Sequence, residues 1–198
     1  TTLRYRNLLV REEVLMRNKT AGLLMEAGAE YDKDKLQGKR YFNELLEVLD
    51  YVPGSVKDMA RMSHESGKYF ERQQKALVGE LTENPALKER IERLMSIPGV
   101  GEITALTWAL EVDDPHRFSN RKKAASYCGL CSGQDESGGK SRRNPLSKQR
   151  NKNLQTILIE AAKLATRWNP QLESVYNKAK DRGANKNEAT IEVARMLV

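Results

Sequence analysis

The residues best suited to chemistry in this sequence are a serine and a group of cations that follows it. Ser137 comes after an acidic pair and before two glycines, and the next cations are Lys140, Arg142 and Arg143. A serine hydroxyl is a weak nucleophile at neutral pH unless a base or a metal ion removes its proton, whereas cations stabilise charge that grows on phosphoryl oxygens. The pattern therefore permits attack on a phosphate. No histidine lies nearby, so a hydrolase triad is not predicted, and the alternative is a flexible Ser-Gly-Gly turn without chemistry.

The positive charge of the chain is concentrated around this serine. The 198 residues carry a formal charge of +7, but residues 115–153 alone hold ten Lys or Arg and two acidic residues. Because each phosphate neutralised by a cation releases counterions, this concentration favours a polyanionic partner over the alternative of an ordinary solvated surface. The candidates for contacts with DNA or RNA are Arg121, Lys122, Lys140, Arg142, Arg143, Lys148, Arg150 and Lys152.

A second candidate site is the turn at residues 97–101, Ile-Pro-Gly-Val-Gly, between two helices with apolar faces. This arrangement resembles a helix-hairpin-helix. Gly99 and Gly101 would let the backbone approach a phosphate, and the unpaired N–H groups at the start of the next helix would point at the anion. The alternative is a helix–helix corner that needs glycine for its conformation alone.

The elements that must position these residues are predicted to be helices throughout, so the expected fold class is all-α. The first helix extends from Leu3 to Ala27 and closes at Gly28, and a second apolar run stops at the turn 52–54. A third helix follows Ser55 and ends before Pro85, with a thin seam typical of a coiled-coil-like hairpin or a dimer arm. The seam consists of Met59, Met62, Ser66, Tyr69, Gln73, Leu77 and Leu81.

Shorter helices broken by glycine and proline are expected after Pro85, so we predict two domains. Residues 1–84 would form the helical arm, and residues 85–198 a compact helical domain with the helix-hairpin-helix. Residues 129–153 consist almost entirely of turn formers and cations, and we predict no strand there. Helix resumes from Leu154 to Trp168, and two further helices flank Gly183.

Other classes of protein are disfavoured by composition. No stretch approaches the roughly 18 apolar residues that a membrane span needs, and no signal core follows the N-terminal cations, so we expect a cytoplasmic protein at the nucleoid. Cys128 and Cys131 make a single C-x-x-C, and His64 and His116 have no ligand spacing to it. Structural zinc requires four ligands, so no metal site or cofactor is predicted in this chain.

The motifs in order closely resemble the C-terminal transposase domain of the IS110 insertion-sequence family, which includes Piv DNA invertases and bridge-RNA-guided serine recombinases. The resemblance covers roughly residues 87–198, and residues 1–84 match the family's helical linker and coiled coil more loosely. The motifs that carry it are residues 96–101, Arg117-Phe118, Ala124, Ala125, Tyr127, Gly129-Leu130, Ser137-Gly138-Gly139, Ser147-Lys148, Asn151 and Leu154, with Tyr176, Lys180, Gly183, Ala189 and Ala194-Arg195 in the tail.

The resemblance implies a recombinase in which a RuvC-like domain holds magnesium and a C-terminal serine attacks DNA. Ser137 is the matching serine, and the composite site would join domains of different subunits. The implied partners are double-stranded DNA, a guide RNA, and further copies of the chain brought together by the long helices. Three departures stand out: Glu136 replaces a first serine, Arg150 replaces a glycine, and the RuvC-like domain has no counterpart here, so we expect this chain to be inactive alone.

Two other functions are compatible with the same residues. The chain would be a non-catalytic helix-hairpin-helix DNA-binding protein if Ser137 has no chemical role. It would be a helical assembly module if the basic segment is only solvated surface, and then DNA binding that weakens with salt is not expected.

Overall fold

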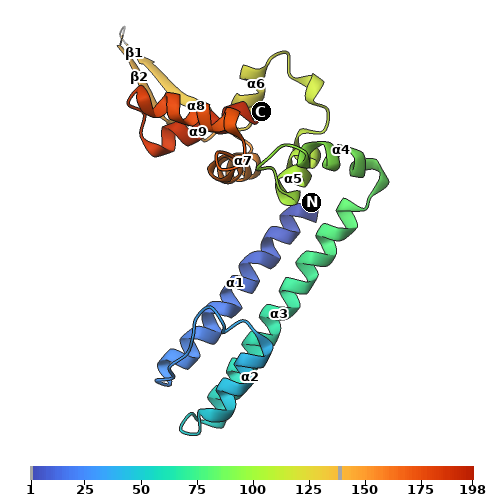
Figure 1. Ribbon diagram of the computed structural model, residues 1–198, viewed down its shortest axis with the longest axis vertical. Helices are drawn as coiled ribbons and strands as arrows, with labels where there is room; N and C mark the ends of the chain where they lie inside the picture. Colours follow the sequence, from blue (N-terminus) through green and yellow to red (C-terminus); the bar gives the residue numbers. More distant parts are fainter. Residues whose placement is uncertain (1, 138–139) are drawn as a thin grey trace. The chain divides into compact units, whose positions relative to one another are not determined.

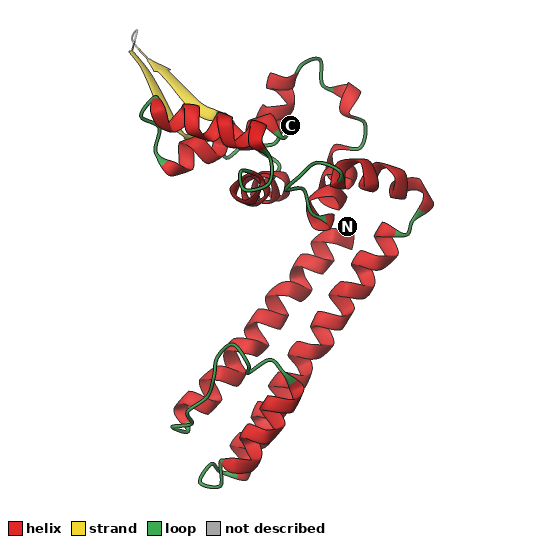
Figure 2. Ribbon diagram, viewed as in Figure 1, coloured by secondary structure: helices red, strands yellow, loops and turns green. Residues whose placement is uncertain are grey.

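A computed structural model describes the backbone of residues 2–137 and 140–198, and the side chains of residues 2–133 and 145–198. The chain divides into two compact units, which we call the arm unit (residues 1–80) and the C-terminal unit (residues 81–198). Helix dominates both, which confirms the all-α prediction (Figure 2). No helix among the described residues is long and apolar enough to cross a membrane.

The arm unit contains two long helices, α1 (Thr2–Glu26) and α3 (Gly54–Thr82), with the shorter α2 (Lys39–Val48) between them in sequence. Figure 1 shows α1 and α3 side by side. The apolar core of the unit gathers where α2 joins them, and the Phe42 ring stacks on His64 with centroids 4.1 Å apart. The buried residues of this core are Leu23, Leu24, Ala29, Leu36, Phe42, Leu45, Leu46, Leu49, Val52 and Ala60.

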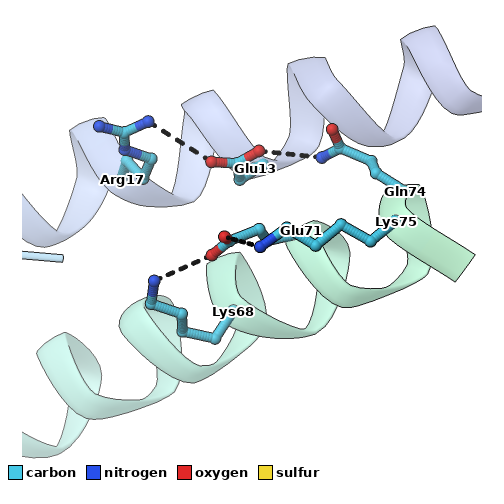
Figure 3. A network of polar contacts seen from close by, with 6 residues as sticks. All are labelled: Glu13, Arg17, Lys68, Glu71, Gln74 and Lys75. Atoms are coloured by element: carbon cyan, nitrogen blue, oxygen red, sulfur yellow. Dashed lines mark hydrogen bonds and ion pairs between the residues drawn. The ribbon is translucent and has the colours of Figure 1, made fainter. Parts of the chain in front are cut away.

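Farther along, α1 and α3 meet through small and polar groups. Gln74 Nε2 donates a hydrogen bond to Glu13 Oε2 at 2.9 Å (Figure 3). A Cβ on Gly67 would lie 3.6 Å from the Met16 Cβ, so the helices approach closely there. Glu71 accepts hydrogen bonds from two lysines of α3, chiefly Lys75, and these lower its pKa to about 2.

The face of α3 that packs within the arm unit differs from the apolar seam that the sequence predicts for a hairpin or a dimer arm. The buried residues of this helix are Ala60, His64, Gly67, Gln74 and Val78. Met59, Met62 and Tyr69 are instead 45%, 68% and 51% exposed. The internal face thus combines the small Ala60 and Gly67 with larger and polar side chains. Met59, Met62 and Tyr69, spaced three and seven positions apart, form a stripe that this chain leaves exposed.

The C-terminal unit is built from α4 (Pro85–Met95), α5 (Glu102–Val112), α6 (Arg121–Tyr127), strands β1 (Ser132–Ser137) and β2 (Lys140–Leu146), α7 (Lys152–Ala165), α8 (Pro170–Asp181) and α9 (Lys186–Met196). Except for α5, the α-helices described in this unit start at asparagine caps, whose side chains accept backbone N–H groups that have no partner within the helix. The caps of α4, α6, α7, α8 and α9 are Asn84, Asn120, Asn151, Asn169 and Asn185.

The strands β1 and β2 form an antiparallel hairpin in the region where no strand was predicted, so that expectation was wrong. The strand sequences, Ser-Gly-Gln-Asp-Glu-Ser and Lys-Ser-Arg-Arg-Asn-Pro-Leu, contain no β-branched or aromatic residue and do not alternate apolar with polar residues. The strands are defined by hydrogen bonds between the two backbones, and these do not require a recognisable pattern of side chains in the sequence.

Candidate nucleic-acid interface

Ser137 is the last residue of β1 and pairs with Lys140, the first residue of β2. The register continues with Asp135 opposite Arg142 and Gln134 opposite Arg143. The hairpin therefore brings the candidate nucleophile and the predicted cations onto adjacent strands. Gly138 and Gly139, which complete the Ser-Gly-Gly motif, lie outside the described residues.

The root of the hairpin is fastened on both sides. The Ser147 N–H donates to the Cys131 carbonyl at 2.9 Å, which joins the segment after β2 to the segment before β1. Gly129 adopts a φ of +71°, and a Cβ there would lie 2.5 Å from the Arg150 Cβ. Gln155 Nε2 donates to the Gly129 carbonyl at 2.6 Å in a buried hydrogen bond. The two ends of the hairpin are thus held against the start of α7.

Glu111 connects the end of α5 to the segment at the start of α7. Its two carboxylate oxygens accept hydrogen bonds from Asn151 Nδ2 at 2.7 Å and Asn153 Nδ2 at 3.0 Å. Asn151 also caps α7 and donates its backbone N–H to the Tyr127 carbonyl at 3.0 Å. Sequence reasoning missed Glu111, because it lies at the end of an ordinary apolar helix and its partners are about 40 positions away.

The predicted cations are distributed over several elements. Arg121 and Lys122 are exposed in the first turn of α6, and Lys152 is exposed at the first position of α7. A cation is disfavoured at a helix N-terminus, since the macrodipole is positive there, so helix stability does not explain these three positions. Lys148 is exposed in the segment between β2 and α7. Lys140, Arg142 and Arg143 lie on β2, where only the backbone is described.

Arg150 differs from the other predicted cations whose side chains the structure describes, because those are exposed. It is half-buried, packs against Gly129 and donates to the Ser147 carbonyl at 3.0 Å. Arg150 therefore has a structural role at the hairpin root.

Gly99 and Gly101 occupy different environments in the turn between α4 and α5. Gly99 has a φ of +94°, and a Cβ there would lie 2.4 Å from the Ala165 Cα on α7. This close packing is what the helix–helix corner alternative requires, and the phosphate contact stays a prediction. Gly101 caps α5 in an extended conformation with no atom near its missing Cβ. Glu102 follows in the first turn, where its carboxylate accepts a hydrogen bond from Thr82.

Cys128 is not a candidate for a reactive thiolate. Cys128 is fully buried, and burial raises the pKa of its thiol to about 12. Cys131 is half-buried, and both residues are free. Within the part of the chain that the structure describes, no three His, Cys, Asp or Glu residues lie close enough to hold a metal ion.

The sequence is similar to known transposases. Residues 91–177, which include the Gly99 turn and the hairpin, match the family described as Transposase IS116/IS110/IS902. The chain is 30% identical over 161 residues to the transposase for insertion sequence element IS1328 of Yersinia enterocolitica, covering 81% of this chain and 48% of that protein. It is also 30% identical over 176 residues to the transposase for insertion sequence element IS1111A of Coxiella burnetii, covering 83% and 46%.

A probable family 20 transposase of Pseudomonas aeruginosa is 27% identical over 169 residues, covering 83% of this chain and 49% of that protein. The chain spans about half the length of these curated relatives. It is therefore related to part of an IS110-family transposase and carries the family's domain over residues 91–177, which confirms that part of the sequence prediction.

Proposed function

We propose that this chain is the DNA-binding part of an insertion-sequence transposase and contributes Ser137 as the nucleophile for DNA strand exchange. The observation that carries the proposal is the register of the hairpin, in which Ser137 pairs with Lys140 at the end of the most basic segment of the chain. Cations beside a phosphodiester position it and stabilise the charge that develops on its oxygens.

In the proposed step, the Ser137 Oγ attacks the phosphorus of a DNA phosphodiester. A bond forms between Oγ and phosphorus, the bond from phosphorus to one deoxyribose oxygen breaks, and that oxygen takes up a proton from water as it leaves. The proton of the serine hydroxyl must pass to a base. We propose that the base belongs to the acidic domain of another subunit, in a composite site, so this chain binds DNA alone but does not recombine alone.

We further propose that copies of the chain assemble through the long helices, with a guide RNA as an additional partner of the basic segment. The exposed stripe of α3 supports assembly, because Met59, Met62 and Tyr69 are uncovered on a helix whose other face is packed. Patches of this kind on a helix are typical of helix–helix interfaces.

The serine chemistry is tested by combining the chain with a separately produced RuvC-like domain from a full-length relative and labelled donor DNA. A protein–DNA adduct that survives denaturation is expected with the natural chain and with the matched control Ser141→Ala. Ser137→Ala should abolish it. An adduct that forms equally well with Ser137→Ala would favour the non-catalytic DNA-binding protein, and an adduct formed without the added domain would contradict the composite site.

A further inference from the structure

Arg117 lies against two aromatic rings. Its Cζ is 4.7 Å from the centroid of the Phe118 ring and 4.5 Å from that of the Tyr127 ring. The two rings are themselves 5.4 Å apart and tilted by 47°, so together they form an aromatic seat for the guanidinium. Contacts of this kind attract a cation through the ring quadrupole.

The aromatic seat is fixed to the core of the C-terminal unit. Phe118 and Tyr127 are partly buried and pack against the buried cluster that contains Leu130 and Leu154. The Tyr127 hydroxyl donates to the Glu111 backbone carbonyl at 3.2 Å, and the Tyr127 carbonyl accepts the Asn151 N–H at the root of the hairpin. Tyr127 therefore contacts both Arg117 and Asn151, at the root of the hairpin.

Arg117 nevertheless remains exposed. Among the described residues, no carboxylate forms an ion pair with it, whereas five exposed or half-exposed arginines elsewhere each have one. The paired arginines are Arg17, Arg40, Arg61, Arg93 and Arg182. The neighbouring Asp114 carboxylate accepts the His116 backbone N–H instead.

We propose that Arg117 binds a phosphate of the DNA backbone near the root of the hairpin that carries Ser137, with Phe118 and Tyr127 holding its guanidinium in place. A guanidinium whose face rests on aromatic rings keeps the N–H groups at its edge available, and that planar edge matches two oxygens of a phosphate. A lysine supplies the same charge but lacks the planar edge that donates to two phosphate oxygens at once. This inference rests on the proposed DNA binding and identifies a contact outside the cations selected by charge alone.

The test is binding of a DNA duplex across a salt series by the natural chain and single variants. Removing one phosphate contact should lower the affinity about tenfold and make the dependence of log K on log salt shallower by about one, so both are expected of Arg117→Ala. Arg117→Lys should restore the salt dependence but not the affinity. Phe118→Leu should lower the affinity and leave the salt dependence unchanged. The matched control is Arg40→Ala, which removes one exposed cation from the arm unit.

Each outcome decides the proposal. An Arg117→Ala variant that binds like Arg40→Ala, while the natural chain binds DNA, would overturn the inference and leave the proposed function intact. Full affinity in Arg117→Lys would overturn the role of the aromatic seat. A natural chain that does not bind DNA would overturn the proposed function itself. Thermal melting of each variant shows whether it folds. If Phe118→Leu does not fold, the two Arg117 variants alone decide whether Arg117 binds a phosphate.

Discussion

Glu111 and Asn151, 40 positions apart in sequence, are joined by a 2.7 Å hydrogen bond from the Asn151 amide to one oxygen of the Glu111 carboxylate. The other oxygen accepts from Asn153 at 3.0 Å. The carboxylate thus links the end of α5 to the start of α7, where the hairpin is rooted. Hydrogen bonds to a charged acceptor in a part-buried setting are among the stronger polar contacts in proteins.

Replacing this carboxylate should destabilise the C-terminal unit. Because Glu111→Ala leaves two part-buried amides without their acceptor, we expect the free energy of unfolding to fall by about 2 kcal/mol. Denaturant unfolding measures the change. The control is Glu160→Ala on the exposed side of α7, which should change stability by less than about 0.5 kcal/mol. Equal losses in the two variants would contradict a positioning role for Glu111.

The turn between α4 and α5 provides a matched pair of glycine substitutions. Gly99→Ala forces a Cβ to within 2.4 Å of the Ala165 Cα at a φ of +94°, so backbone strain and overpacking should together cost about 3 kcal/mol. Gly101→Ala meets no atom within 4 Å at a negative φ and should be nearly neutral. Thermal unfolding compares them. Similar melting temperatures for the two variants would show that Gly99 is not required by this packing.

The stability of the arm unit should depend on pH through His64. Burial lowers the pKa of this residue, which is stacked on Phe42, so the folded state favours the neutral ring. The contribution of the neutral His64 ring to the stability of the arm unit is therefore complete above about pH 6.5, the pKa of histidine in the unfolded chain. It is lost as the pH falls below that value towards the lower pKa of His64 in the folded state. Melting at pH 7.5 and 5.5 should show the loss. His64→Phe should remove this part of the pH dependence, and an unchanged pH dependence in that variant would contradict the assignment.

The exposed stripe of α3 should mediate assembly. Light scattering on the natural chain is expected to give a mass above that of one chain, and the double variant Met62→Lys/Tyr69→Lys should lower it. Two added charges repel across a helix–helix interface and cannot be desolvated cheaply. Val48→Lys serves as the control, because Val48 is 72% exposed on α2, outside the stripe. A natural chain that stays monomeric at high concentration would contradict assembly through α3.

The helices could be predicted closely from the sequence because their boundaries depend on local signals. The first helix, expected from residue 3 to residue 27, extends from Thr2 to Glu26, and Gly28 follows with a φ of +71°. Asn84-Pro85 ends α3 and caps α4, and Asn169-Pro170 caps α8. Caps and glycine stops act within a few residues, so one sequence contains the information.

The remaining features depend on contacts between distant residues. The strands of the hairpin are defined by backbone pairing, Glu111 by partners about 40 positions away, and the Arg117 seat by a ring ten positions along. The packed face of α3 was missed because its residues are small or polar, whereas the larger apolar residues on the same helix attracted the prediction. In each case the residue that makes the contact lies too far along the sequence for a local pattern to reveal it.

The claim that the basic segment binds DNA is tested most directly by duplex binding at increasing salt, comparing the natural chain with the triple variant Lys140→Ala/Arg142→Ala/Arg143→Ala. Six to ten phosphate contacts should cost about 10³ to 10⁵ in affinity between about 50 and 200 mM salt, and the triple variant should lower the slope by about 2.7. The control is the triple variant Arg11→Ala/Lys19→Ala/Lys33→Ala in the arm unit, which has the same net charge as the hairpin variant. Steep binding that flattens only in the hairpin variant is the predicted result. No binding, or equal slopes in the two variants, would contradict the account.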